Sequence, residues 1–245
     1  MSQNQSDKSE NQKYQTSGFP RISDVLKHWH TEYSESSELF RISIFEFRIF
    51  LIMDKEIKEA IRVLKDGGIV IFPTDTAFGI GCRIDDEKAI KRLFKIRKRP
   101  PSQATPVLVE SLDMAQAYLE NIPQEVIDRL IEPYWPGAIT LILQSRIDKV
   151  PKLVRGGGQK LGVRMPNHQT ALALIRGVGV PVLGPSANFH GEKTPYRFED
   201  LDKKLVKLVD YVVVGACALK QQSTVIDCSE KPWRIIRQGA IDIKL

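Results

Sequence analysis

Short apolar runs alternate with amphipathic helical patterns from Asp54 to the C-terminus, and this alternation is the strongest constraint on the fold. In GGIVIFPTDT at 67–76, a buried strand over 69–72 is stopped by Pro73, which has no N–H to donate to a sheet. The run AITLILQ at 138–144 has so little polarity that we expect a strand buried on both faces. Interleaved strands and helices are typical of an α/β domain with a mixed sheet flanked by helices.

The remaining elements follow from periodicity and from turn and cap residues. We expect further strands near 106–110, 160–166, 180–188, 211–214, 223–227 and 234–237. We expect helices starting at Asp54, after Asp85 or Asp86, near 112–119 and 124–132, after a cap at Asn167, and near 199–208. No stretch of linker composition interrupts these elements, so one domain is predicted over 53–245.

Residues 1–52 are predicted to be an N-terminal extension. Residues 1–20 have the polar composition of disordered chains, and the apolar run at 39–52 carries no turn signal that ties it to the domain. Met53 stands where a start codon is expected, which suggests that residues 1–52 are dispensable and not translated in the cell. The alternative is an extra strand or lid, because apolar residues at 39–52 are costly to leave in water.

Composition excludes several classes of protein. Three cysteines far apart and four scattered histidines predict neither a disulfide framework nor a metal site. There is no run of about 18 apolar residues and no apolar leader core, so we expect a cytoplasmic protein without a membrane span.

Basic charge is concentrated after residue 52. Residues 1–52 hold six basic and seven acidic residues, whereas the remainder holds 30 basic and 23 acidic residues, a net charge of +7. Seven of the basic residues lie between Lys88 and Arg99. A concentrated basic site favours a polyanionic partner such as a nucleotide or RNA, although a solvated helix face is the commoner outcome for a charge run.

Three predicted strand ends carry small hydroxyl or amide residues: FPTDT at 72–76, GPSAN at 184–188 and QQSTVID at 221–227. Each motif alone is an ordinary turn sequence. Together they predict a polar pocket, because ligands of open α/β sheets bind in the crevice at strand ends.

Arginines supply the charge for such a pocket. Arg97 and Arg99 precede a proline stop, and alternate positions of an extended segment point the same way, so the two guanidiniums are candidates to grip adjacent phosphates. Arg164 lies in an apolar strand and must be paired, either with a ligand carboxylate or with an internal acidic residue. Arg237 repeats this pattern.

No Walker-type phosphate loop, dinucleotide-binding glycine motif or nucleophile elbow occurs in the sequence. If the chain is an enzyme, it therefore works by binding and orienting its reactants, as in phosphoryl or nucleotidyl transfer.

The ordered motif series resembles the YrdC-like threonylcarbamoyl-AMP synthase family over about 54–245. The motifs are PTDTAFGIG, R-x-R-P, PGAIT, VRMP, PSANFHG, STVID and RQGAI. The resemblance implies a twisted mixed sheet around a large basic cavity, and the chain looks like the family's short, single-domain type. It also implies synthesis of threonylcarbamoyl-AMP from L-threonine, bicarbonate and ATP with Mg²⁺, with release of pyrophosphate, and a partner complex that modifies tRNA.

The resemblance also assigns roles to individual residues. Threonine binding is implied for Thr76, Arg164, Gly184 and Ser223. ATP binding is implied for Arg99, Thr105, Lys160, Ser186, Asn188, Thr194 and Arg237, with Arg97 and Arg99 positioning and stabilising charge. No side chain is identified as a metal ligand.

Three positions depart from the family pattern. Arg97 replaces a common lysine, Phe78 replaces a common tyrosine, and Glu110 stands where some relatives have a histidine near threonine.

Two alternative functions remain open. One is an RNA-binding module without synthase activity, although the retained arginine pair favours the synthase. The other is a carbamoyl-transfer domain like that of hydrogenase maturation proteins, which normally lies in a longer chain with zinc-finger motifs. Direct binding of tRNA or double-stranded RNA is expected to be weak and salt-dependent, because only a basic surface is indicated.

Overall fold

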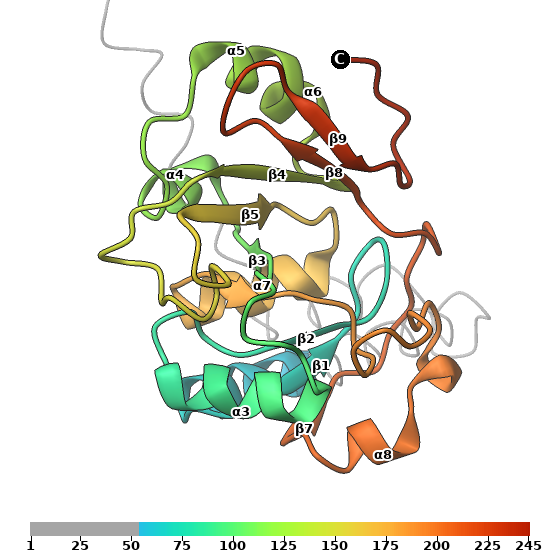
Figure 1. The fold of residues 1–245 in the computed structure, drawn as a ribbon. Helices are drawn as coiled ribbons and strands as arrows, with labels where there is room; N and C mark the ends of the chain where they lie inside the picture. The colour runs from blue at the N-terminus through green and yellow to red at the C-terminus, as the bar shows by residue number, and fades with distance from the viewer. Residues whose placement is uncertain (1–53) are drawn as a thin grey trace, which may run out of the picture. The chain divides into compact units, whose positions relative to one another are not determined.

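The apolar strands form two mixed sheets in the computed structural model, which describes residues 54–245 (Figure 1). The smaller sheet has the order β2 (Gly79–Gly81), β1 (Val70–Phe72), β7 (Tyr211–Val212). The larger has the order β6 (Val182–Leu183), β3 (Val107–Leu108), β5 (Lys160–Arg164), β4 (Ile139–Gln144), β8 (Thr224–Asp227), β9 (Arg234–Arg237). The α/β fold class with mixed strands is confirmed, and the structure adds that the strands divide between two sheets.

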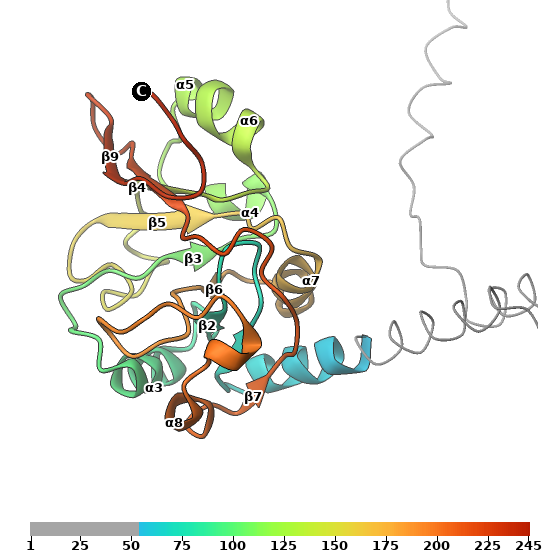
Figure 2. The same ribbon diagram turned by 90° about the vertical axis from the view of Figure 1, so that its right-hand side faces the viewer.

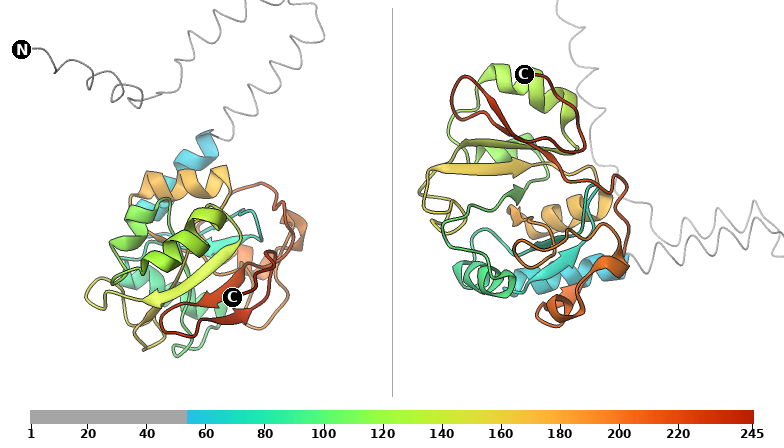
Figure 3. Two further views of the ribbon diagram at one scale, coloured as in Figure 1. Left: turned by 90° about the horizontal axis from the view of Figure 1, so that it is seen from above. Right: turned by 45° about the vertical axis from the view of Figure 1, so that its right-hand side comes forward.

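Helices flank both sheets. Residues 54–65 are helical, and the other helices are α3 (Glu87–Arg97), α4 (Leu112–Gln116), α5 (Gln124–Val126), the π-helical η1 (Ile127–Ile131), α6 (Glu132–Tyr134), α7 (Gln169–Val178), the 3₁₀ turn η2 (Phe198–Asp200) and α8 (Lys203–Val206). Figures 1 and 2 show α5 and α6 beside the larger sheet, and α3 and α8 at the opposite end beside the smaller sheet. The right view of Figure 3 shows the same separation.

Local cap chemistry explains where α3 begins and ends. Asp86 accepts a 2.9 Å hydrogen bond from the backbone N–H of Ala89, as the sequence predicts for an N-cap. Lys98 adopts a left-handed conformation with φ 53°, and its N–H donates back to the last turn. The helix therefore stops at Arg97, before the two prolines that were expected to stop it.

The start of α7 differs from the prediction. The cap residue is His168, not Asn167, because the carbonyl of His168 accepts the first helical bond from Leu172 N. The His168 ring does not cap the helix, since its Nε2 bonds the carbonyl of Ala216 at 3.2 Å.

One side of the larger sheet forms core, and the other side carries most of the polar residues of β4, β5 and β8. Leu141 of β4 lies opposite Val163 of β5 and Ile226 of β8, and all three are buried in the main hydrophobic cluster. This cluster includes apolar residues of α4, α5 and η1, so those helices cover that side. Side chains alternate along a strand, so the neighbouring residues of β4, β5 and β8 face the opposite side.

The two sheets meet where β2 approaches β6. Ala187 N donates to Phe78 O at 2.8 Å, and Leu183 N donates to Cys82 O at 2.9 Å. This approach requires Gly81, because a Cβ there would lie 2.1 Å from the carbonyl oxygen of Leu183.

The predicted extension at 1–52, with its alternative strand or lid at 39–52, lies outside the described residues and stays a prediction. The described residues belong to one unit of the chain. Among them, no helix has both the length and the apolar character needed to cross a bilayer.

We expect Gly81→Ala to lower the free energy of unfolding by about 1–3 kcal/mol, because the added methyl group would overpack a buried backbone contact between the sheets. Chemical denaturation of the full chain measures this. The matched control is Gly79→Ala in the same strand, where the nearest atom to the new Cβ is 3.5 Å away. Equal free energies of unfolding for the two variants would show that the close approach of β2 to β6 does not require glycine at position 81.

Candidate functional site

A cavity of about 640 Å³ collects all three polar strand-end motifs. Thr74 and Thr76 come from PTDT, Gly184 and Ser186 from GPSAN, and Gln222 and Ser223 from QQSTVID; all of them line the cavity. The volume is within the range of small-molecule sites. The predicted convergence of the three motifs is therefore observed.

The floor of the cavity is a sheet face. It is made by alternate residues of three adjacent strands. These are Thr140 and Ile142 of β4, Lys160, Gly162 and Arg164 of β5, and Val225 of β8 with Ser223 just before it. We expected a crevice beyond the strand ends. The structure instead uses the polar side of β4, β5 and β8, because their other side is occupied by the core.

The lining is strongly cationic. It contains Arg97, Arg99, Arg155, Lys160, Arg164 and Arg237, and no Asp or Glu of residues 54–245 lines it. Two of these cations are neutralised, Lys160 by Asp227 at 3.1 Å and Arg164 by Asp75. Within the described part of the chain, the other four arginines have no carboxylate within salt-bridge distance. A cavity with this excess of positive charge suits a polyanion.

Arg164 is buried and held by acceptors from three segments. Its Nε donates to Gly137 O at 2.9 Å, its Nη1 to Thr76 Oγ1 at 2.6 Å, and its Nη2 to Asp75 Oδ1. The internal ion pair, one of the two alternatives for this residue, is thus present. Burial lowers the pKa of Arg164, and the charge of Asp75 opposes that shift. Arg164 also lines the cavity, and the ligand carboxylate, the other alternative, stays a prediction.

Arg97 presents an unpaired nitrogen to the site. It is only 3% exposed; its Nε donates to Asn188 O at 3.0 Å and its Nη2 to Asn188 Oδ1 at 3.1 Å. Its Nη1 is buried and has no hydrogen-bond partner within residues 54–245. Burial, together with the nearby charge of Arg99, lowers the pKa of Arg97 to about 10. A buried donor without a partner is costly unless a ligand supplies the acceptor.

Arg97 and Arg99 line the cavity together, as predicted, but not for the predicted reason. The segment between them is not extended, because Lys98 is left-handed at the end of α3. Arg99 then donates from Nε to Gln103 O at 3.2 Å and from Nη2 to Ala104 O. The turn at Lys98, not strand alternation, brings both guanidiniums to one cavity.

Hydroxyl groups complete the lining near β8 and Thr105. Ser223 Oγ and Thr140 Oγ1 are 2.9 Å apart, and Arg237 Nη2 donates to Ser223 Oγ at 3.1 Å. Thr105 is 1% exposed, and among residues 54–245 its Oγ1 has no hydrogen-bond partner. The ligand contact that the resemblance implies for Thr105 stays a prediction.

Three residues singled out in the sequence do not line the cavity. Asn188 stands behind Arg97, and its Oδ1 also accepts from Ser186 Oγ at 2.7 Å. Thr194 accepts from Gln222 Nε2 at 2.7 Å, so it contacts the site through Gln222. Glu110 faces Arg176, with Arg176 Nε 3.4 Å from its Oε2.

The sequence analysis missed Arg155, Gln222 and Asp75 as parts of the site. Gln222 and Asp75 lie inside quoted motifs, but alternation alone does not tell which side chain faces the ligand. Arg155 lies in a loop with three consecutive glycines, which gave no sign of facing the arginine pair.

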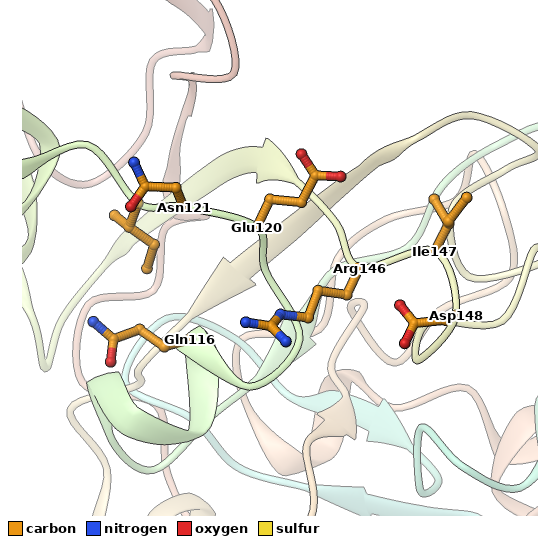
Figure 4. A pocket seen from close by; sticks show the side chains of 7 residues that line it. Gln116, Glu120, Asn121, Arg146, Ile147 and Asp148 are labelled. Atoms are coloured by element: carbon orange, nitrogen blue, oxygen red, sulfur yellow. The ribbon is translucent and has the colours of Figure 1, made fainter.

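A second hollow lies elsewhere and contains no predicted site residue. It has a volume of about 650 Å³ and is lined by Gln116, Glu120, Asn121, Ile122, Arg146, Ile147 and Asp148. In Figure 4 the carboxylates of Glu120 and Asp148 and the guanidinium of Arg146 point in different directions. Residues 54–245 also contain no group of three or more His, Cys, Asp or Glu side chains placed to hold a metal ion.

We expect Asp75→Ala to destabilise the fold by about 3–5 kcal/mol, because it leaves the buried Arg164 without its carboxylate. The double variant Asp75→Ala with Arg164→Met should be more stable than Asp75→Ala alone, since no buried charge is left unpaired. Denaturant unfolding measures both variants. Lys91→Ala, which breaks an exposed pair with Glu87, is the control and should change stability little. If Asp75→Ala were as stable as this control, the ion pair would not support the fold.

The chain is similar to known proteins over most of its described part. The Sua5/YciO/YrdC family model, described as "Telomere recombination", matches residues 62–239. The threonylcarbamoyl-AMP synthase of Bacillus subtilis is 34% identical over 195 residues, covering 77% of this chain and 54% of that protein. The chain thus spans about half the length of the curated synthases that it matches at this identity.

Two crystal structures have a similar fold. P. abyssi Sua5 complexed with L-threonine has 32% identity and a TM-score of 0.71, covering 75% of this chain and 54% of that one. E. coli YciO has 28% identity and a TM-score of 0.69, covering 77% of this chain and 91% of that one. The model match, the identity to the synthases and the ordered motifs around one cavity show that this chain belongs to the Sua5/YciO/YrdC family.

Proposed function

We propose that this chain is an L-threonylcarbamoyladenylate synthase, a nucleotidyltransferase. It would combine L-threonine with bicarbonate and ATP to give threonylcarbamoyl-AMP and pyrophosphate, and a partner complex would transfer the threonylcarbamoyl group to tRNA. The relatives named as threonylcarbamoyl-AMP synthases support this activity, and so does a related structure with L-threonine bound.

The observation that carries the proposal is the charge distribution of the cavity. Four arginines without carboxylate partners line the same space as the neutralised Arg164 and Lys160. A triphosphate needs the unneutralised cations. Threonine carries one carboxylate and one ammonium group, so it suits the end where Arg164 is already balanced by Asp75.

The proposed reaction has two steps. The threonine amine attacks bicarbonate to form a carbamate with loss of water. A carbamate oxygen then attacks the α-phosphorus of ATP, and the bond to the β-phosphate breaks to release pyrophosphate. Both partners in the second step are anions, so fixed positive charge lowers the barrier by offsetting their repulsion.

This chain's residues would hold the reactants in place. On the threonine side, Thr76, Arg164, Gly184 and Ser223 line the cavity together. On the nucleotide side, Arg99, Thr105, Lys160, Ser186 and Arg237 line it, with Asn188 and Thr194 acting through Arg97 and Gln222. The unpartnered Arg97 Nη1 and Thr105 Oγ1 are free to bond phosphate or ribose oxygens.

Mg²⁺ would enter as part of the substrate MgATP. The described lining offers hydroxyls but no carboxylate, whereas protein-held Mg²⁺ is usually bound through one or two carboxylates. The donor set therefore fits a metal held chiefly by phosphates and water. The metal would supply additional charge stabilisation at the phosphates.

The RNA-binding alternative rests on the basic charge and on the similarity to E. coli YciO, whose curated description is an uncharacterized protein. Family membership alone does not decide between this alternative and the synthase, so the decisive evidence is turnover.

We expect the purified chain to release pyrophosphate from MgATP only when L-threonine and bicarbonate are both present. A coupled pyrophosphate assay, with threonine or bicarbonate omitted in turn, measures this. Pyrophosphate release that does not depend on threonine would refute the substrate assignment, and a lack of release under all conditions would favour the RNA-binding alternative.

We expect Arg99→Ala to weaken ATP binding by about 10- to 100-fold and Arg164→Ala to weaken threonine binding by a similar factor, because each removes a charge-assisted hydrogen bond. Calorimetry with each ligand separates the two effects. Arg164→Lys keeps a charge beside Asp75 and controls for loss of the buried pair. Equal loss of both ligands in either alanine variant would indicate that the arginine supports the fold and not one ligand.

A further inference from the structure

Arg155 is a cationic side chain of the cavity for which neither the motifs nor the resemblance gives a role. It lies in the loop between β4 and β5 and lines the same space as Arg97 and Arg99. Among residues 54–245 it has no carboxylate within salt-bridge distance. Its charge is therefore available to a ligand.

The loop itself holds the Arg155 guanidinium in place. Nε donates to Val150 O at 3.0 Å, and Nη1 donates to Gly158 O. Arg99 is held in the same manner by the carbonyls of Gln103 and Ala104 in its own loop. In both residues backbone carbonyls, which carry no net charge, fix the side chain while leaving its positive charge unneutralised.

The two arginine-bearing loops are packed directly against each other. Thr105 N donates to Val154 O at 2.9 Å. Gly156, with φ +60°, lies so close that a Cβ there would be 2.5 Å from Ala104 N and 2.7 Å from Ser102 O. Arg99 bonds Ala104 on one side of this junction and Arg155 precedes Gly156 on the other, so the two loops that meet here each carry an arginine that lines the cavity.

We propose that Arg155 and Arg99 form a clamp for the polyphosphate of the nucleotide, and that Arg155 binds the part that leaves as pyrophosphate. This inference rests on the proposed function for the identity of the nucleotide, but the binding of a polyphosphate anion can be tested without turnover. Two guanidiniums with free N–H groups match phosphate oxygens in geometry and charge.

The clamp makes a prediction about which ligands depend on Arg155. Inorganic pyrophosphate and ATP contain the anionic group that the clamp binds, whereas AMP and threonine lack it. We expect Arg155→Ala to raise the Kd of magnesium pyrophosphate and of ATP by about 10- to 100-fold, the range for loss of a hydrogen bond to a charged group. The Kd of AMP and of threonine should change less than about threefold, which is the size expected from experimental error and small packing changes.

Isothermal titration calorimetry on the full chain tests this with wild type, Arg155→Ala, Arg155→Gln and Lys152→Ala. The glutamine variant can still donate to the loop carbonyls without carrying a charge, so it should lose pyrophosphate as the alanine variant does. Lys152 is an exposed residue of the same loop outside the cavity lining, and its variant should bind pyrophosphate as wild type does.

Three outcomes would overturn the clamp. They are wild-type protein that does not bind pyrophosphate, an Arg155→Gln variant that binds it normally, and a uniform loss of all four ligands in both Arg155 variants. A different result would reject the proposed function while leaving the clamp intact. Pyrophosphate binding that depends on Arg155, without threonine-dependent turnover, would retain the clamp and reject the synthase.

Discussion

The buried ion pair between Arg164 and Asp75 joins the two sheets at the site. Arg164 is the last residue of β5 in the larger sheet, and Asp75 follows β1 of the smaller sheet, with side chains only 7% and 6% exposed. Two charges this deep are tolerated because Gly137 O and Thr76 Oγ1 provide the other acceptors for the guanidinium. The same contact orients PTDT: Asp75 turns toward Arg164, while Thr74 and Thr76 line the cavity. Fold and site therefore share one interaction.

The cavity separates its cations into two groups with different surroundings. Arg164 and Lys160 have carboxylate partners, whereas Arg97, Arg99, Arg155 and Arg237 are held by carbonyls, amides or hydroxyls. Burial lowers the pKa of Arg97, Arg99 and Arg237, which is the direction expected when removing a guanidinium from water costs free energy. An anionic ligand offsets that cost, and such a site binds a polyphosphate more strongly than a neutral molecule.

All three departures from the family pattern can be placed in the structure. Phe78 needs no hydroxyl partner, because its buried ring packs edge-on against Phe198 with centroids 6.2 Å apart. Glu110 lies beside Arg176 of α7 and is not part of the cavity lining. The third departure is Arg97 in place of lysine. Its planar guanidinium donates to both the backbone carbonyl and the side-chain Oδ1 of Asn188, which a single ammonium group does not match in geometry.

Local sequence patterns were enough to locate many of the elements and the motifs. Hydrophobic periodicity and cap residues predict β1, β4, β8, β9 and α3 near their observed positions, because these features depend on neighbours within one or two turns. The convergence of PTDT, GPSAN and QQSTVID was also foreseeable, from their shared composition. The division into two sheets, the sheet face that forms the floor, and the pairing of Asp75 with Arg164 could not be predicted from these patterns. The same is true of Arg155, which lines the cavity together with Arg99 in a structure where their two loops pack closely around Gly156. These facts depend on contacts between residues far apart in the chain, and local patterns carry no information about which distant charge or loop a side chain will meet.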